Sequence, residues 1–255
     1  MGKFRIIVIA LVVLIGISGS AYADVALLQP GDFVGLTFWL VSIACLATTV
    51  FLFLERGSVF SKWTASVTVA GIITGVAFMH SMYVRNIWVA TGDAPIVYRY
   101  VDWLITMPLL TIQFYLVLSV VKKVSPTLFW KFLIAPLAMV LGGYAGEVGY
   151  ISPFLGFVIW MVGWLYILYE IFAGESGKLC AKSTNKAMVG AFETMRMILT
   201  IGWATYPLGY VFGYLTGGID SNTLNVIYNF ADFINKIAFG LVIWVAAKNN
   251  TSESR

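Results

Sequence analysis

Charged residues are scarce in this chain. Only 11% of its 255 residues are Asp, Glu, Lys or Arg, whereas 60% are hydrophobic. A soluble domain has about one quarter charged residues, so this composition excludes an ordinary soluble protein and favours a single domain that crosses a membrane several times. The formal net charge is +4, but the basic residues are spread over short loops, which argues against a nucleic-acid partner.

Cysteine and histidine are also rare, with two cysteines and one histidine in the whole chain. Cys45 lies in an apolar stretch and Cys180 lies far away in a polar connection. This placement predicts no disulfide framework. We also expect no metal site.

The N-terminus has the features of a signal peptide. Lys3 and Arg5 precede an apolar stretch, and Ala21-Tyr22-Ala23 has the small-x-small pattern of a cleavage site. We therefore expect a cleaved signal peptide over 1–23 and a mature seven-helix domain over 24–255. An uncleaved first helix is the alternative.

Seven further segments are long and apolar enough to cross a bilayer as helices, which takes about 20 residues each. Connections rich in polar residues, Gly and Pro separate them. The sequence therefore predicts an all-α membrane protein, a bundle of seven transmembrane helices. The segments are residues 32–54, 63–89, 96–121, 127–145, 152–173, 187–214 and 223–247.

Lysine and arginine gather in the first, third and fifth connections between these segments and after the last segment. The fourth and sixth connections have none, and the second has only Arg85 and Arg99 at its flanks. The positive-inside rule then places the N-terminus outside and the C-terminus in the cytoplasm. This orientation agrees with a cleaved signal peptide and with a multi-pass protein of a bacterial inner membrane.

Lys236 is a lone cation inside the last apolar segment, and Asp232 precedes it by four residues. On a helix the two share a face, about 6 Å apart along the axis. Charge inside a membrane-length helix is costly and normally marks function. Such a lysine can pair with a carboxylate, or its amine can condense with a carbonyl compound to form a Schiff base.

A second set of polar and ionisable residues lies at the start of the third segment. Arg99, Asp102 and Thr106 are spaced by three and four residues, so they form one polar stripe on a helix. The predicted orientation puts this stripe at the depth of Asp232 and Lys236. Two carboxylates around one lysine can exchange a proton, because neighbouring charges set each pKa. A static ion-pair cluster that fixes helix packing is the alternative.

Aromatic and rigid residues lie at the same depth. Trp103 is in the third segment, and Trp203, Tyr206 and Pro207 are in the sixth. Aromatic residues in the middle of a helix are usually packing residues, but these share a level with Lys236 and would complete a pocket. Pro207 should kink its helix and free a backbone carbonyl.

Three motifs carry a resemblance to a known family. They are RYVDWLITMPLL at 99–110, GWATYP at 202–207 and NFADFINK at 229–236. Together they resemble the microbial rhodopsins, and within them the proteorhodopsins, over essentially the whole chain. The resemblance implies a light-driven transporter or photoreceptor rather than an enzyme. It also implies that all-trans retinal is bound to Lys236 as a protonated Schiff base.

The resemblance assigns roles to other residues of these motifs. Asp102 would be the primary counterion and proton acceptor, Asp232 the second counterion, and Arg99 would tune the pair. Leu110 falls at the colour-tuning position, where leucine resembles green-absorbing members and glutamine resembles blue-absorbing members. The residues that would clamp the polyene are Trp103, Trp203, Tyr206 and Pro207.

His80 is the only histidine and lies in the second segment. A lone histidine inside a membrane is often only a hydrogen-bonding contact between helices. In the proteorhodopsins the matching histidine bonds the acceptor carboxylate, tunes its pKa and meets a tryptophan of the neighbouring protomer, which would be Trp39 here. Imidazole can share a proton with an acid near neutral pH. The family therefore implies a homo-oligomer, a pentamer or hexamer.

Gln113 departs from the family pattern. Proton-pumping proteorhodopsins carry an acid eleven residues after the acceptor, on the same helix face and about 16 Å nearer the cytoplasm. Gln113 occupies this position, and an amide cannot act as a general acid. We expect slow reprotonation from water or bulk solvent. A surrogate donor is a further option, namely Glu193 in the sixth segment, unless Glu193 simply pairs with Arg196 near the interface.

The sequence thus predicts a light-driven outward proton pump with slow recovery. A slow-cycling sensory photoreceptor with an unknown transducer partner is the main alternative, and a pump for another ion is a weaker one. Chloride pumps have a neutral residue at the position of Asp102, and sodium pumps have a second acid at the position of Thr106. This chain matches neither pattern.

Overall fold

The computed structural model describes residues 27–253. The expected signal peptide, residues 1–23, lies outside the described residues, so its cleavage stays a prediction. The described part of the chain is helical and contains the seven long segments expected from the sequence. Their bounds are α2 Phe33–Glu55, α3 Thr64–Thr91, α4 Arg99–Ser119, α5 Pro126–Glu147, α6 Pro153–Phe172, α8 Lys186–Tyr210, and a last segment made of α9 Ser221–Asp232, η4 Phe233–Ala238 and α10 Phe239–Glu253.

Six of the seven segments are long and apolar enough to cross a membrane. The seventh, α8, carries Lys186, Glu193 and Arg196 besides its aromatic motif, which makes it more polar than the others. It lies within the same bundle, beside α10, α9 and α4. The predicted seven-helix membrane fold is therefore confirmed.

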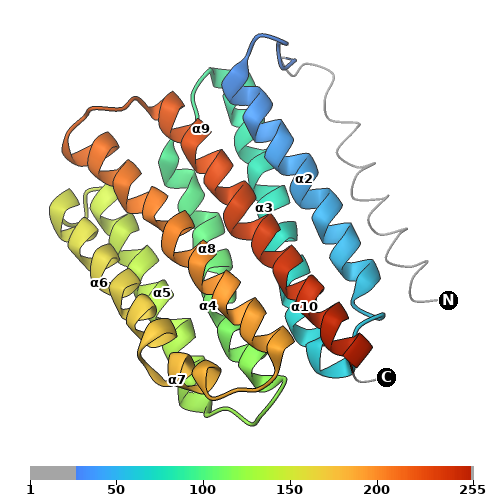
Figure 1. Cartoon of the computed structure of the whole chain (residues 1–255). Helices are drawn as coiled ribbons and strands as arrows, with labels where there is room; N and C mark the ends of the chain where they lie inside the picture. Colours follow the sequence, from blue (N-terminus) through green and yellow to red (C-terminus); the bar gives the residue numbers. More distant parts are fainter. Residues whose placement is uncertain (1–26, 254–255) are drawn as a thin grey trace.

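The helices form a closed ring in which neighbours in sequence pack side by side (Figure 1). The last segment completes the ring, because α9 packs on α2 while α10 packs on α3 and α8. Its middle section therefore contacts elements from both ends of the chain. The end of the bundle where α9 begins is called the outer end below, and the end where α10 stops is called the inner end.

Polar capping residues fix where several helices begin. Each side-chain oxygen accepts a hydrogen bond from a backbone N–H in the first turn, which would otherwise have no partner. Proline occupies the first helical position of α5 and α6, where its missing N–H costs nothing. The capping residues are Asp32, Ser125, Ser152, Asn185 and Asp220.

Asp220 lies outside the membrane-spanning segments. Hydrogen bonds from the hydroxyl and the backbone amide of Thr223 lower the pKa of Asp220 below its usual value. The cap of α9 is therefore ionised at neutral pH, at the positive end of the helix dipole.

The connection between α6 and α8 contains a short helix, α7 (Glu175–Ala181), where the sequence indicated only a polar loop. Glu170 near the end of α6 is buried. Its carboxylate accepts a hydrogen bond from the backbone N–H of Ser176 at 3.1 Å and pairs with Lys131 of α5 at 3.3 Å. These contacts hold the connection against the bundle, and no local pattern predicts them because they join three helices.

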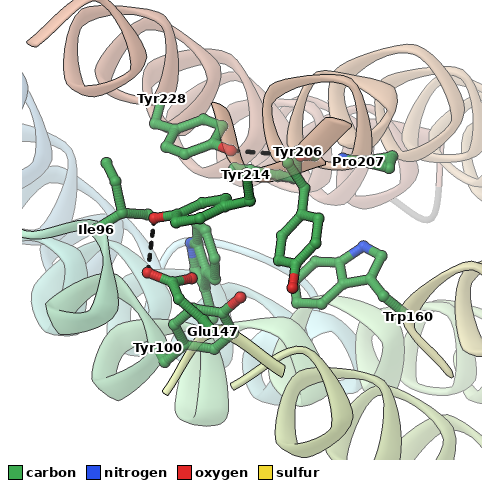
Figure 2. A pocket seen from close by; sticks show the side chains of 10 residues that line it. Ile96, Tyr100, Glu147, Trp160, Tyr206, Pro207, Tyr214 and Tyr228 are labelled. Atoms are coloured by element: carbon green, nitrogen blue, oxygen red, sulfur yellow. Dashed lines mark hydrogen bonds between the residues drawn. The ribbon is translucent and has the colours of Figure 1, made fainter. Parts of the chain in front are cut away.

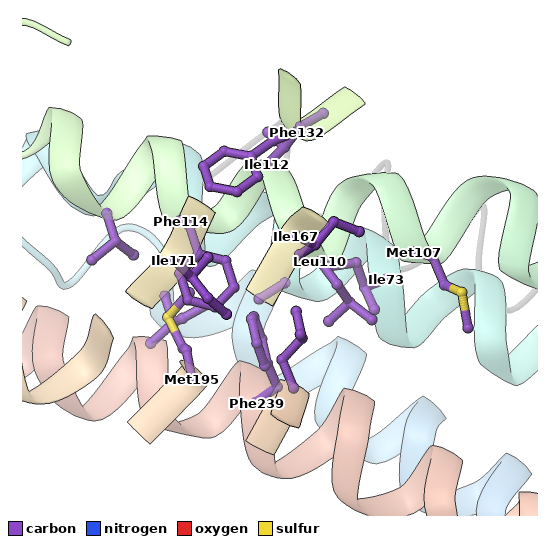
Figure 3. Packing of buried hydrophobic residues seen from close by; sticks show 14 of the residues in the cluster. Ile73, Met107, Leu110, Ile112, Phe114, Phe132, Ile167, Ile171, Met195 and Phe239 are labelled. Atoms are coloured by element: carbon purple, nitrogen blue, oxygen red, sulfur yellow. The ribbon is translucent and has the colours of Figure 1, made fainter. Parts of the chain in front are cut away.

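Large apolar side chains fill the inner half of the bundle (Figure 3). Phe114 of α4 is at its centre, with ring centroids 5.0 Å from Phe192, 5.9 Å from Phe132 and 6.1 Å from Phe239. Three other helices supply these rings. This apolar packing closes the inner half around the few polar groups that it contains.

Glycines permit close contact between α5 and α6. A Cβ added to Gly156 would lie 2.8 Å from the Cα of Gly146 and 3.1 Å from the carbonyl oxygen of Gly142. Both neighbours are backbone atoms, so relief requires the two helices to separate. In contrast, a Cβ added to Gly190 on α8 meets nothing within 4 Å.

We therefore expect the same substitution to have opposite effects at two helical glycines. Gly156→Ala should lower the free energy of unfolding by about 1–3 kcal/mol, because it overpacks the α5–α6 contact. Gly190→Ala should raise it by about 0.5–1 kcal/mol, because alanine restricts the unfolded chain more than glycine does. Thermal unfolding in detergent, followed by circular dichroism, measures both. Equal effects at the two positions would contradict this account of the packing.

Candidate functional site

Lys236 lies near the middle of the last helical segment with only 2% of its side chain exposed. Its amine donates a hydrogen bond to Asp102 of α4 and pairs with Asp232, one turn earlier, at 3.2 Å. Both carboxylates are buried. The structure therefore brings together the lysine and the two acids that the sequence singled out.

Arg99 joins the same cluster from the outer end of α4. Its guanidinium lies 3.4 Å from Asp232 Oδ2, and the arginine is also buried. The four groups carry two positive and two negative formal charges. Buried charges are tolerated only when they are paired and hydrogen-bonded, so this balance is what allows them to share a low-dielectric interior.

Thr106 completes the polar stripe of α4 that the spacing predicted. Its hydroxyl donates to the Asp102 carbonyl oxygen at 3.0 Å and lies 3.3 Å from Asp102 Oδ2. The second carboxylate oxygen, Oδ1, has no hydrogen-bond partner among the residues that the structure describes. One face of the Asp102 carboxylate is thus available to a further group.

The helix is locally widened around the lysine. Residues Phe233–Ala238 form a π-helical segment, a rare conformation that often occurs at functional sites. Within it, the amide of Asn235 donates to the hydroxyl of Tyr206 at 3.2 Å. A Cβ on Gly202 of α8 would collide with the Asn235 side chain. Gly202 therefore lets α8 approach the lysine-bearing segment closely.

An aromatic wall lies beside the charges, and it includes Trp103 and Tyr206 from the predicted set. The ring of Trp103 packs edge-on against Tyr206, Trp160 and Tyr228, with centroids 5.1, 5.7 and 5.8 Å away. The hydroxyl of Tyr206 donates to Asp232 Oδ1 at 2.8 Å, which ties the wall to the charge cluster. Trp203 is 3% exposed.

A narrow pocket with little free space extends from this wall toward the outer end (Figure 2). Trp103, Trp160 and Pro207 line it together with Glu147, whose carboxylate accepts a hydrogen bond from the Tyr214 hydroxyl at 2.7 Å. The wall and pocket are therefore mostly aromatic, with one carboxylate near the outer opening.

His80 and Asp102 line one side groove between α3 and α4. His80 Nε2, like Asp102 Oδ1, has no hydrogen-bond partner in the described part of the chain. The histidine thus lines the same groove as the carboxylate that it was expected to bond, but no hydrogen bond joins the two among the described residues. Trp39 is on α2 with 48% of its surface exposed, in a separate outward-facing groove with Leu36, Leu40 and Phe230.

Gln113 lies in the inner half and is fully buried. Its amide donates to the backbone carbonyl of Ser66 on α3 at 2.9 Å, while Gln113 Oε1 and the Ser66 hydroxyl have no partner within residues 27–253. Leu110, one turn closer to Lys236, belongs to the apolar core.

Glu193 does not enter this interior. Its side chain is 57% exposed and pairs with Arg196 at 3.8 Å. The Arg196 guanidinium lies 4.5 Å from the Phe172 ring centroid. The alternative reading of this pair, a surface ion pair near the inner interface, agrees with the structure better than a surrogate donor does.

Two buried asparagines of α9 escaped the sequence interpretation. Asn225 and Asn229 both contact Arg99. A signal existed, since Asn225, Asn229, Asp232 and Lys236 are spaced by four, three and four residues and form one polar stripe on a helix. The two amides carry no charge, so their burial is less conspicuous in the sequence than that of Asp232 and Lys236.

The fold and the site define a seven-helix membrane protein with a buried lysine between two carboxylates. Residues 32–250 match the family described as bacteriorhodopsin-like protein. The chain therefore belongs to this family, which confirms the family-level resemblance inferred from its motifs.

The relatives of this chain include green-light absorbing and blue-light absorbing proteins. The chain is 47% identical over 228 residues to the green-light absorbing proteorhodopsin of Gamma-proteobacterium EBAC31A08, covering 89% of this chain and 91% of the relative. It is 48% identical over 229 residues to the blue-light absorbing proteorhodopsin of Gamma-proteobacterium Hot 75m4, with the same coverage. The crystal structure of blue light-absorbing proteorhodopsin from Med12 matches with a TM-score of 0.74 at 47% identity, covering 86% of this chain and 100% of that one.

Proposed function

We propose that this protein is a light-driven outward proton pump of a bacterial inner membrane, with its N-terminus outside and its C-terminus in the cytoplasm. The observation that carries the proposal is the position of Lys236, whose buried amine lies between two buried carboxylates. The similarity to proteorhodopsins over 89% of the chain supports it.

The proposed cofactor is all-trans retinal, bound to Lys236 as a protonated Schiff base. A buried primary amine can form a covalent bond with an aldehyde, and Asp102 Oδ1 next to it lacks a partner. When bound, retinal supplies light absorption and a change of shape that follows it. The aromatic residues proposed to hold its chain are Trp103, Trp203, Tyr206 and Pro207, and Leu110 is proposed to favour green absorption.

The residues of the charge cluster divide the proton chemistry among them. Asp102 is the proposed acceptor of the proton held on Lys236 Nζ, because its carboxylate lies closer to that atom than the Asp232 carboxylate does. Thr106 holds the acceptor through its hydroxyl. Asp232 keeps its negative charge, since Arg99 and the Tyr206 hydroxyl both stabilise its carboxylate. Once protonated, Asp102 delivers its proton to the outer side.

The return of a proton from the inner side is proposed to be slow. Gln113 lies at the donor position, and its amide has no acidic proton to give. Glu193 is largely exposed and paired with Arg196, so it is a poor substitute. A proton must then come from water. A slow cycle would also suit a photoreceptor, which is the second candidate function.

We further propose that several copies assemble in the lipid membrane as a pentamer or hexamer. His80 and Asp102 line a groove open at the side of the bundle, and the unpaired Nε2 of His80 needs a partner there. Trp39 is an exposed aromatic side chain at the surface of α2. A tryptophan from one protomer has both the apolar surface and the N–H donor that the groove of its neighbour requires.

Removal of this tryptophan should weaken the assembly. We expect Trp39→Ala to shift the protein from oligomer toward monomer in native mass spectrometry, because the aromatic anchor is lost. Trp130→Ala, which removes an exposed tryptophan on α5, is the matched control and should leave the oligomer intact. An unchanged oligomer in Trp39→Ala would contradict the proposed contact.

The pumping proposal is tested with cells that express the protein and are supplied with retinal. Green light should lower the external pH, and a protonophore should abolish the change, because outward proton transport acidifies the medium. Lys236→Ala should give neither colour nor acidification. A coloured, bleachable protein that causes no pH change would contradict pumping and favour the photoreceptor or a pump for another ion.

Gln113→Glu should speed recovery of the dark state. A protonated glutamic acid can donate to the Ser66 carbonyl as the Gln113 amide does, so the site would hold an acid with its proton in place. Positioned general acids accelerate proton transfer by about 10²-fold or more. Flash photolysis measures the recovery rate, and Gln113→Leu is the control that should give no acceleration. An unchanged rate in Gln113→Glu would show that this position does not limit recovery.

A further inference from the structure

Arg99 is held mainly by neutral amides. Its nearest carboxylate atom, Asp232 Oδ2, lies 3.4 Å away, whereas Asn229 Oδ1 accepts a hydrogen bond from Nη2 at 2.6 Å. A guanidinium has five N–H donors and no acceptor, so a buried arginine needs several oxygen atoms around it. Here the side chains of α9 provide them.

Asn229 links the guanidinium to α2. While its oxygen accepts from Arg99, its Nδ2 donates to the hydroxyl of Thr37 at 2.9 Å. Thr37 in turn donates to the carbonyl oxygen of Val34 at 2.7 Å. Asn229 and Thr37 are both buried. The position of the guanidinium is therefore connected, through one amide, to a helix that carries none of the four charges.

Asn225 forms a parallel link to the connection between α3 and α4. Its Oδ1 accepts from Arg99 Nη2 at 3.1 Å and from Nε at 3.4 Å, and its backbone oxygen accepts from Nη2 at 3.2 Å. Its Nδ2 donates to the carbonyl oxygen of Ala94 at 2.8 Å. The rings of Phe38 and Tyr228 lie 5.4 and 5.5 Å from the guanidinium carbon, within the range of favourable cation–π contact.

From this geometry we infer that Asn225 and Asn229 are positioning residues, an amide clamp that fixes the charge of Arg99 beside the carboxylates facing Lys236. The inference deepens the proposed function and rests on it. An amide meets both demands of each position. It accepts from a cation on one side and donates to a neutral oxygen on the other, without a charge of its own.

The absence of charge on the clamp matters for the proton acceptor. A carboxylate at either position would compensate Arg99 locally and weaken its effect on Asp102 and Asp232. A neutral clamp leaves the full positive charge of Arg99 facing those two acids. The position of that charge thus depends on α2 and on the α3–α4 connection, neither of which contributes a charge to the cluster.

The pH titration of colour in the dark tests the clamp, because the absorption of the pigment responds to the charge of the carboxylates next to Lys236. Asn229→Ala should move the midpoint upward by about one pH unit, since loss of one strong hydrogen bond to a cation lets Arg99 stabilise the carboxylates less. Asn225→Ala should move it in the same direction. Asn222→Ala, which removes an exposed amide of the same helix, is the matched control and should leave the midpoint unchanged.

Thr37→Val provides a sharper variant, because Thr37 does not touch Arg99 and valine keeps its shape. It should shift the midpoint upward by less than Asn229→Ala does. The double variant Asn229→Ala with Thr37→Val should shift it no further than Asn229→Ala alone, since both act through one link. A merely structural role for Thr37 predicts no shift, and independent action predicts a sum of the two shifts.

A coloured protein whose midpoint is unmoved in Asn229→Ala, Asn225→Ala and Thr37→Val would overturn the clamp while leaving the proposed function intact. A wild-type chain that never acquires colour with retinal would instead contradict the proposed function. In that case, thermal unfolding of the retinal-free protein tests the clamp. Non-additive losses of melting temperature in the Asn229 and Thr37 variants are expected, and additive losses would overturn it.

Discussion

The balance of charge around Lys236 is the constraint on which the rest of the site depends. One lysine, one arginine and two aspartates lie in an interior where an unpaired charge would cost several kcal/mol. Removal of any one would leave a buried partner uncompensated. The cluster therefore forces α4 and the last helical segment into contact at one depth, and the helices that surround them must exclude water from it.

Close helix approach is what makes that balance possible. Gly202 lets α8 reach Asn235, and the π-helical segment places Lys236 where it contacts both acids. The Tyr206 hydroxyl then bridges between Asn235 and Asp232. A side chain at Gly202 would separate these elements. The glycine, the wide helical turn and the tyrosine thus act together in positioning one amine, although only the tyrosine was singled out from the sequence.

Patterns along one helix predicted more of this protein than contacts between helices did. Hydrophobic length gave the seven segments, and spacings of three and four gave the stripe of Arg99, Asp102 and Thr106. The α7 helix had no such signal, because Glu170 meets Ser176 and Lys131 only after folding. The π-helical segment had no such signal either. The roles of Asn225 and Asn229 depend on Thr37 and Ala94, more than 120 residues earlier in the chain. A local pattern contains no information about such partners.

Amides occupy the buried polar positions on both sides of the charge cluster. Asn225 and Asn229 lie toward its outer side and Gln113 lies toward the inner end, and each donates to a neutral oxygen of another element. Each of these amides therefore donates its hydrogen bond without adding a charge. The two positive and two negative charges of the cluster balance, so the proposed movement of a proton from Lys236 to Asp102 would change the charge of two members but not the total. On the outer side the amides hold Arg99 without opposing its charge, and on the inner side Gln113 adds no acid to the interior.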